Sequence, residues 1–293
     1  GSADFSRYNE GLRGGKIRIR AKMRAIDKKT IVITEIPFST TTVSLIDSII
    51  SANDKGKIKI KKVEDNTSSK VEIVITVHPD TTAEKTIDAL YAFTDCEVSI
   101  SPNACIIRDD KPFFVGVNEM LVISTEKTKN LLKRELEIRK DELETDWHFS
   151  SLEKIFIENR IYRDIEECET WEAVLEAIDK GLTPFKALLR REITQEDIVK
   201  LTEIKIKRIS KFDAFKADEY IKGIETEIAE VENHLAHLND FAIAYFKNLL
   251  KKYGKGRERK TEITSFDNII ATEVAVANQK LYVNKQEGFA GYG

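Results

Sequence analysis

Polar and apolar residues alternate without interruption from Lys16 to Arg24. Every second position is a cation, and apolar residues stand between the cations: Lys16, Arg18, Arg20, Lys22 and Arg24 against Ile17, Ile19, Ala21 and Met23. Side chains of a β-strand point alternately to its two faces, so the pattern predicts one strand with a cationic and an apolar face. Same-face residues repeat at about 6.6–6.8 Å, close to a phosphate spacing of roughly 6–7 Å along one nucleic-acid strand. The pattern favours contact with a polyanion, and the alternative is a solvated edge strand whose cations prevent aggregation.

The remainder of the first 116 residues carries further strand and helix patterns. The predicted strands are 30–36, 57–61 and 71–77, the predicted helices are 40–50 and 81–93, and 104–107 with 113–115 are predicted to form a hairpin. In the first helix we expect Ser39 or Thr40 as the N-cap and Val43, Ile46 and Ile50 on one side. Strands with helices packed against them indicate an α+β domain at residues 1–116.

Long helical patterns replace the strands from residue 117 onward. Residues 117–146 predict one long helix, and 217–249 carry apolar residues at steps of four and three, which is typical of a coiled coil. Shorter helices are predicted between them, at 150–159, 170–180, 184–191 and 194–209. We therefore expect residues 117–253 to form a long antiparallel coiled coil with a small helical globule at its tip, about residues 148–214. The alternative is two straight helices of an ordinary bundle.

Residues 254–293 begin as a basic linker. Apolar residues around Asn278-Gln-Lys then predict one β-hairpin at the start of a truncated C-terminal β domain: Val274, Val276, Leu281 and Val283. The chain opens with Gly1-Ser2 and no methionine. We expect an excised piece of a longer protein, in which Gly1-Ser2 is a cloning remnant.

Charge is distributed unevenly along the chain, although the net value is only −3. Residues 1–116 contain 18 Lys and Arg against 16 Asp and Glu, whereas residues 117–253 contain 23 against 29. Within 141–179 there are 13 acids and three bases. A DNA ligand is therefore expected at the N-terminal part and is repelled by the acidic stretch.

The cysteines Cys96, Cys105 and Cys168 are too few and too scattered for a disulfide framework or a zinc site. They indicate reduced thiols in a cytoplasmic protein. The sequence contains neither an apolar run of membrane-spanning length nor a signal-peptide pattern, so we expect no membrane partner.

Candidate catalytic and metal-binding patterns are weak. No stretch has the spacing of a phosphate-binding loop, which predicts no ATP site in this chain. His234 and His237 have a spacing that suits a metal, but no acidic or cysteine residue is placed to complete the set. The acidic groups at 109–110 and 164–167 could hold a hard cation, but the first is expected in a turn and the second on an acidic helix face, so no metal site is predicted. Tyr8 is the one conceivable nucleophile beside the basic strand, and we expect it to pack at the domain edge.

Several stretches, and their order, resemble the A subunits of bacterial type IIA DNA topoisomerases, those of topoisomerase IV first and those of gyrase next. The stretches are Arg7-Tyr-Asn-Glu-Gly-Leu-Arg-Gly-Gly-Lys-Ile-Arg-Ile-Arg-Ala-Lys22, Ile31-Val-Ile-Thr-Glu-Ile-Pro-Phe38, Val71-Glu-Ile-Val-Ile75, Leu201-Thr-Glu-Ile-Lys-Ile-Lys-Arg-Ile-Ser210 and Arg259-Lys-Thr-Glu-Ile263. The resemblance spans nearly the whole chain.

The resemblance implies that residues 1–116 are the tower, which supports the flanks of a cleaved DNA duplex, and that residues 117–253 are the coiled coil. The helical globule would meet its two-fold mate to form the exit gate of a homodimer. Matched position by position, Arg13, Lys16, Arg18, Arg20 and Lys22 fall on the strand that the resemblance places nearest the DNA. With Arg24 of the alternating pattern they are the predicted DNA-binding residues.

The family enzyme passes one duplex through another in an ATP-dependent reaction. The domain that carries its strand-cleaving tyrosine lies upstream of the matched part, and Tyr8 does not match that tyrosine. Mg²⁺ and ATP are expected on the partner B subunit. We therefore expect no catalysis by this chain alone. The alternative function is a structural coiled-coil adaptor whose basic strand contacts an acidic protein.

Overall fold

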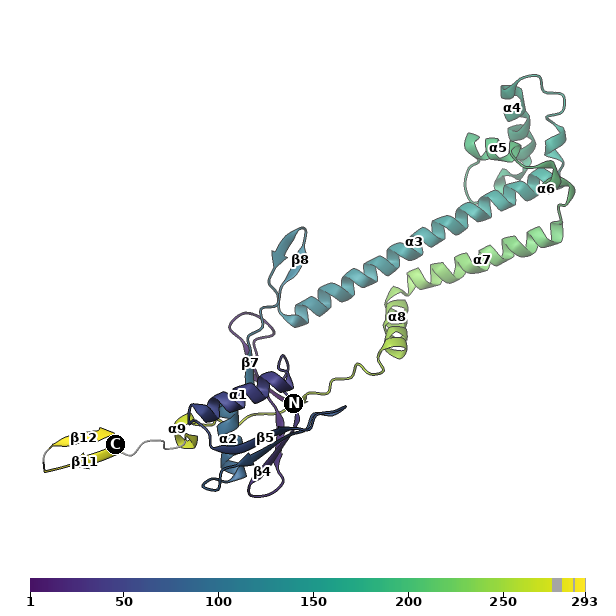
Figure 1. Cartoon of the computed structure of the whole chain (residues 1–293). Helices are drawn as coiled ribbons and strands as arrows, with labels where there is room; N and C mark the ends of the chain where they lie inside the picture. Colours follow the sequence, from purple (N-terminus) through teal and green to yellow (C-terminus); the bar gives the residue numbers. More distant parts are fainter. Residues whose placement is uncertain (276–280, 287, 293) are drawn as a thin grey trace. The chain divides into compact units, whose positions relative to one another are not determined.

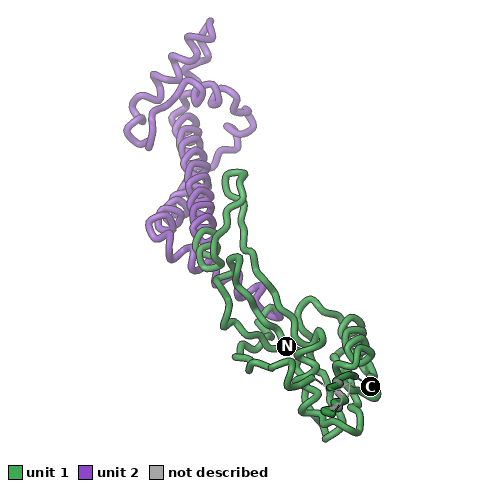
Figure 2. Tube along the Cα trace, turned by 90° about the vertical axis from the view of Figure 1, so that its left-hand side faces the viewer, with its two compact units in different colours: residues 1–123, 257–293 green, residues 124–256 purple. Residues whose placement is uncertain are grey.

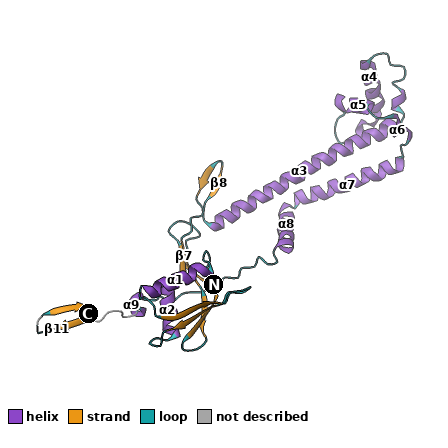
Figure 3. Cartoon of the chain, viewed as in Figure 1, coloured by secondary structure: helices purple, strands orange, loops and turns teal. Residues whose placement is uncertain are grey.

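The computed structural model describes residues 1–275, 281–286 and 288–292. The chain divides into two compact units (Figure 2). The first unit comprises residues 1–123 and 257–293, and the second comprises residues 124–256. Strands belong to the first unit and long helices dominate the second, as the colours of Figure 3 show. The α+β class predicted from the sequence is confirmed at this level.

One sheet of the first unit joins segments from distant parts of the sequence. Its strand order is β10-β1-β2-β7, with β1 at Ser2–Arg7, β2 at Lys16–Arg20, β7 at Glu97–Ile100 and β10 at Glu262–Ile263. β2 is antiparallel to both β1 and β7, whereas β10 runs parallel to β1. The segment after the long helices therefore returns to the first unit and extends its sheet.

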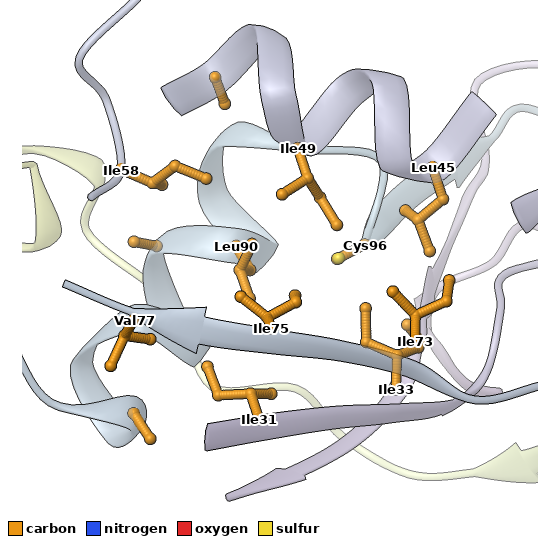
Figure 4. Close-up of a cluster of buried hydrophobic side chains, with 14 residues drawn as sticks. Ile31, Ile33, Leu45, Ile49, Ile58, Ile73, Ile75, Val77, Leu90 and Cys96 are labelled. Carbon is orange, nitrogen blue, oxygen red and sulfur yellow. The ribbon is translucent and has the colours of Figure 1, made fainter. Parts of the chain in front are cut away.

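The second sheet of this unit holds the main core. Its order is β3-β4-β6-β5, all antiparallel, with β3 at Lys22–Ala25, β4 at Thr30–Glu35, β5 at Ile60–Asp65 and β6 at Ile73–Val77. Helices α1 (Thr42–Asp54) and α2 (Ala83–Phe93) pack on one face. Alternate isoleucines of β4 and β6 are fully buried, namely Ile31, Ile33, Ile73 and Ile75. They pack against Leu45 and Ile49 of α1 and Leu90 of α2, as Figure 4 shows. Burial of each such side chain contributes about 1.5–3 kcal/mol.

The single strand predicted from Lys16 to Arg24 is wrong, because the chain changes sheets at Ala21. Ala21 is buried, its amide donates to the carbonyl of Cys96 at 2.8 Å, and its carbonyl accepts from the Tyr91 hydroxyl at 3.0 Å. The bond to Cys96 extends the β2–β7 pairing by one residue, and the Tyr91 hydroxyl takes up the Ala21 carbonyl, after which β3 pairs with β4 in the second sheet. The cations of the stretch are consequently divided between two sheets.

The predicted face of α1 is also wrong. Leu45, Ile49 and Ala52 are buried, whereas Val43 and Ile50 are exposed. The N-cap is Thr41, one residue beyond the expected positions, and it forms a capping box with Ser44. The predicted hairpin near residue 110 is present as β8 (Ile106–Arg108) and β9 (Lys111–Phe113).

Two antiparallel helices form the centre of the second unit: α3 (Val117–Glu158), of which residues 124–158 belong to this unit, and α7 (Ala214–Ala236). Figure 1 shows them side by side. Their seam buries Leu136, Leu143, Trp147, Ile224, Ile228 and Val231. The Lys140–Glu232 pair at 2.9 Å and the Trp147 indole, which donates to Glu225 at 2.9 Å, bridge the two helices. The lower number on α3 meets the higher number on α7, which fixes the antiparallel direction.

The apolar repeat predicted as one helix from 217 to 249 is interrupted at His237. Its φ of −119° and ψ of 47° are not helical, and its amide and ring Nδ1 both lie 3.0 Å from the carbonyl oxygen of Asn233. A separate helix, α8 (Leu238–Tyr253), follows in a different direction (Figure 1).

Short helices complete the second unit: η1 (Ile161–Arg163), α4 (Trp171–Leu182), η2 (Thr183–Leu188), α5 (Gln195–Thr202) and α6 (Ile206–Ser210). They share a core with the end of α3 that includes Leu152, Phe156, Ile178, Leu182 and Leu201. The predicted helix at 150–159 is the last part of α3, and the one at 194–209 is divided into α5 and α6.

At the C-terminal end, α9 (Ala271–Val274) precedes the strands β11 (Leu281–Asn284) and β12 (Phe289–Tyr292). Val274, predicted in a hairpin strand, is helical instead. Val276 and the predicted turn at 278–280 lie outside the described residues. The hairpin that the structure does show pairs β11 with β12.

Candidate nucleic-acid interface

Arg18 and Arg20 on β2 are neutralised by carboxylates of the two neighbouring strands. Arg18 pairs with Asp4 of β1 at 2.8 Å, and Arg20 pairs with Glu97 of β7 at 2.6 Å. The strand register explains these contacts, because Arg18 lies opposite Asp4 and Arg20 lies opposite Glu97. Opposite charges directly across a ladder stabilise a sheet. Two of the six predicted DNA-binding cations are therefore held by acids of their own sheet.

The segment Glu262–Asp267 covers the same two arginines. The guanidinium of Arg20 lies 4.4 Å from the ring centroid of Phe266, and that of Arg18 lies 5.4 Å from it. Arg18 also donates to the Phe266 carbonyl at 3.1 Å, and Arg20 donates to the Asp267 carbonyl at 3.2 Å. We call this segment the strap. Cation–π contacts and hydrogen bonds to main-chain oxygens together hold it against β2.

Asp4 is the buried anion of this arrangement. Its carboxylate accepts from the amides of Ser6 and Phe266 and from Arg18. The hydrogen bond from the Ser6 amide, followed by that from Arg18, lowers the pKa of Asp4 far below its ordinary value. Asp4 therefore stays ionised and keeps both Arg18 and the strap in place.

Lys22 is neutralised in a similar way at the start of β3. Its ammonium lies 3.2 Å from Glu262 of the strap and 3.4 Å from Glu35 of β4. The hydrogen bond to Glu262 raises the pKa of Lys22 above its ordinary value, with a further contribution from Glu35. The strap thus contacts three of the six predicted cations.

The other three predicted cations are Arg13, Lys16 and Arg24. None of them forms an ion pair in the part of the chain that the structure describes. Arg13 and Arg24 are exposed, and Lys16 is half-buried. Arg24 lies in the second sheet, opposite Val32 of β4.

Lys16 lies opposite Arg7 in the β1–β2 ladder, and Arg7 is exposed. Two like charges therefore face each other in this ladder, and neither forms an ion pair among the described residues.

Arg7 is a candidate residue that the sequence patterns did not predict. It belongs to no alternating pattern, because β1 carries one cation among polar and apolar residues. The pairing register of β1 and β2 shifts between Asp4 and Arg7, and after this shift Arg7 lies opposite Lys16. Such a shift has no signature in the sequence. Arg13 lies in the loop that precedes β2. We call Arg7, Arg13 and Lys16 together the open cationic end.

Tyr8 packs at the edge of the first unit. Its ring contacts Phe5 edge-on, with 5.4 Å between the ring centroids. It is half-buried, and its amide donates to the Phe5 carbonyl at 2.9 Å. These contacts give Tyr8 a packing role.

A polar cluster around the buried side chains of His148 and Asp197 lies in the second unit. Arg191 donates two hydrogen bonds to Asp197, at 2.8 and 3.0 Å, and the Nε2 of His148 lies 3.2 Å from the same carboxylate. Asp197 also closes the capping box of α5 with Thr194. Burial, followed by the charge of Arg191, lowers the pKa of His148. The cluster joins α3 to α5 and is structural.

Metal-binding and membrane-spanning features are absent from the described ranges. Within them, no group of three or more His, Cys, Asp or Glu residues is arranged to hold a metal ion. The ring of His234 stacks on Phe241 with 4.6 Å between centroids. No helix in those ranges is both long and apolar enough to cross a bilayer.

Comparison with known proteins places these features in a family. Residues 3–249 match the family model of the DNA gyrase and topoisomerase IV A subunit. The chain is 34% identical to the A subunit of DNA topoisomerase 4 from Borreliella burgdorferi over 291 residues, which is 99% of this chain and 46% of that protein.

Gyrase A subunits are more distant relatives. The identity is 24% to that of Staphylococcus epidermidis, over 87% of this chain and 29% of that protein. It is also 24% to that of Mycobacterium leprae, over 94% of this chain and 22% of that protein. The chain spans less than half the length of each of these relatives.

Proposed function

Because the chain belongs to the family of DNA gyrase and topoisomerase IV A subunits, we propose that it is the tower and exit-gate part of a type IIA topoisomerase A subunit. In the whole enzyme this part supports DNA binding and the dimer gate during ATP-dependent passage of one duplex through another. The observation that carries the proposal is the family match over residues 3–249, which extends through the strands of the first unit and the helices of the second.

The first unit would contact the flanks of the bound duplex. In this proposal the phosphates are held mainly at the open cationic end, by Arg7, Arg13 and Lys16, and on β3 by Arg24. Free cations supply the sequence-independent part of DNA affinity, because each phosphate contact releases counterions. Arg18, Arg20 and Lys22 contribute less, since their charges are shared with Asp4, Glu97, Glu35 and Glu262.

The second unit would provide the gate. Among the exposed apolar side chains of its short helices are Trp171 of α4, at 52%, and Leu188 of η2, at 67%. Both lie on the helical globule that the sequence predicted as the contact with a second copy. Symmetric dimers are the commonest assemblies of soluble proteins, and exposed aromatic residues are enriched at such interfaces. The long helical pair behind the globule would act as the arm of the gate.

The chemistry would reside elsewhere in the enzyme. The strand-cleaving tyrosine would belong to a domain upstream of the matched part, since Tyr8 is engaged in packing against Phe5. Mg²⁺ and ATP would be bound by the B subunit, and the enzyme would act in the cytoplasm. This chain would therefore support a reaction that it does not catalyse alone.

A plasmid relaxation assay tests the proposal. The complete A subunit that contains this segment, mixed with its B subunit, should relax supercoiled plasmid in the presence of ATP. The 293-residue chain should not relax the plasmid with or without the B subunit. A complete protein that binds its B subunit but leaves plasmid topology unchanged would contradict the proposal.

A further inference from the structure

A cavity of about 1060 Å³ opens within the second unit. Its walls come from the end of α3, the α5–α6 connection, α6 and the start of α7. Six cationic residues line it: Lys200, Lys205, Lys207, Arg208, Lys211 and Lys216. Aromatic side chains complete the wall, namely Phe149, Phe212 and Tyr220.

This concentration of positive charge stands out in an acidic unit. Residues 124–256 contain 24 Lys and Arg against 28 Asp and Glu. Four acids share the cavity wall, Asp146, Glu153, Glu203 and Asp213. Cations gathered around one cavity repel each other unless an anion lies between them. The local charge is therefore opposite to that of the unit as a whole.

Three of the six cations have partners. Arg208 makes a bidentate ion pair with Glu153, with one contact at 2.7 Å, and Glu153 is only 5% exposed. Lys200 lies 3.7 Å from Glu196, and Lys216 lies 3.9 Å from Asp213. The Arg208–Glu153 pair anchors α6 to α3, and both residues line the cavity.

The remaining three are Lys205, Lys207 and Lys211. All are exposed, and no ion pair is formed by them among the residues that the structure describes. Lys205 precedes α6, Lys207 lies inside it and Lys211 follows it. Lys207 and Lys211 are four residues apart, a spacing that places like charges on one side of a helical turn. Lys205, two residues before Lys207, lines the same cavity, so the three lysines form one cluster at its wall.

We propose that this lysine cluster holds phosphates of a DNA duplex and is a second DNA contact, separate from the one in the first unit. The inference rests on the proposed function, which supplies the duplex. Lysine ammonium groups act as point charges toward phosphate oxygens and need no fixed fork geometry, which suits contact with a duplex irrespective of its sequence. An exposed Ile206, at 83%, lies within the cluster and provides a position for a probe.

Salt-dependent DNA binding by the full chain tests the proposal. The test variant carries Lys205→Gln, Lys207→Gln and Lys211→Gln. The control carries Lys222→Gln, Lys247→Gln and Lys251→Gln, which remove three exposed lysines of the same unit that lie outside the cavity. Fluorescence anisotropy of a labelled 30-base-pair duplex, roughly three helical turns, is measured over a range of KCl concentrations.

The slope of log affinity against log salt is negative, and its magnitude should be smaller in the test variant by up to about 2.7, which is three phosphate contacts at about 0.9 each. The control should leave the slope near that of the unmodified chain. Equal slopes in the two variants would overturn the inference and leave the proposed function standing. A chain that does not bind the duplex at all would overturn both.

A crosslinking experiment gives a second, local readout. Ile206→Cys is labelled with a photo-crosslinker in a chain that carries Cys105→Ser and Cys168→Ser, because Cys96 is buried. The labelled residue should crosslink to the duplex, and Lys205→Gln, Lys207→Gln and Lys211→Gln should reduce the yield. Absence of a crosslink would overturn the inference. Protection by ATP or inorganic phosphate at concentrations that leave anisotropy unchanged would also overturn it, since the cavity would then bind a small anion.

Discussion

The guanidinium of Arg20 lies 4.4 Å from the ring centroid of Phe266, a residue 246 positions later in the chain. The same guanidinium also lies 4.6 Å from the ring centroid of Tyr91. Arg20 therefore contacts two aromatic rings and is neutralised by Glu97. This contact ties the segment that follows the long helices to the sheet of the first unit.

Removal of the Phe266 ring should loosen the strap. Phe266→Ala deletes two cation–π contacts, each of about 0.5–1 kcal/mol. The β1–β10 pairing, the Lys22–Glu262 ion pair and the hydrogen bonds to the main chain of residues 266 and 267 remain. Amide hydrogen exchange of residues 262–267 should become roughly fivefold faster or more, because a loss of about 1 kcal/mol raises the equilibrium constant for local opening about fivefold. Ile270→Ala, at a residue that is 54% exposed, is the control. Unchanged exchange in the Phe266 variant would show that the ring does not hold the strap.

The second unit should lose stability as the pH falls below about 6.5. Because burial and Arg191 lower the pKa of His148 in the folded state, the unfolded chain binds the proton more readily. Stability is therefore fully present above the ordinary histidine pKa and declines below it, by at most about 1.4 kcal/mol per pH unit for one group. The pKa of Asp197 is lowered despite its burial, because Arg191 and Thr194 donate to it, so its contribution is lost only at much lower pH.

Tryptophan fluorescence during urea unfolding reports this unit selectively, because both tryptophans, Trp147 and Trp171, belong to it. The urea midpoint should fall between pH 7.5 and pH 5.5. His148→Gln should flatten that dependence while it lowers stability overall. If the urea midpoint of the His148→Gln variant falls with pH as much as that of the unmodified chain, groups other than His148 cause the pH dependence.

The seam between α3 and α7 should dominate the stability of the helical pair. Ile228 is 2% exposed and packs within the seam cluster, so Ile228→Ala should cost about 2–4 kcal/mol through lost burial and the cavity left behind. Ile243→Ala, at a residue that is 51% exposed, should cost less than about 1 kcal/mol. Both are measured by urea unfolding followed through Trp147. A similar loss of unfolding free energy in the two variants would contradict the conclusion that the α3–α7 seam dominates stability.

The proposed gate predicts a homodimer. Sedimentation equilibrium of the full chain should show a monomer–dimer equilibrium, and Trp171→Glu with Leu188→Glu should shift it toward monomer. Both side chains are exposed, so the variant should retain its fold, which circular dichroism checks. Monomer alone at the highest attainable concentration would argue against a gate contact in this part of the enzyme.

Local patterns in the sequence predicted those elements whose apolar faces are packed within one unit. The alternating isoleucines of β4 and β6 and the apolar spacing of α3 identified the sheet and the long helix, since burial of one face enforces those periods. The face of α1 was not predictable in this way. Two apolar stripes compete in that helix, and only the sheet beneath it selects Leu45 and Ile49.

Long-range contacts account for the other differences. The change of sheet after Ala21 depends on its strand partners, since β2 pairs with β7 and β3 pairs with β4, while the alternation of cations continues through it. Asp4, Glu97 and Glu262, which neutralise the predicted DNA-binding strand, are brought to it by the sheet register and the strap. The interruption at His237 lies inside an unbroken apolar repeat with no glycine or proline beside it to mark it.

The most direct test of the account is the salt dependence of duplex binding at the open cationic end. The full chain is compared with a variant that carries Arg7→Gln, Arg13→Gln and Lys16→Gln, and with the same Lys222, Lys247 and Lys251 control. We predict sequence-independent binding. The magnitude of its slope of log affinity against log salt should decrease by up to about 2.7 in the first variant and should be unchanged in the control. Binding that is insensitive to salt, or equally weakened in both variants, would contradict the assignment of the first unit as the DNA-contacting tower.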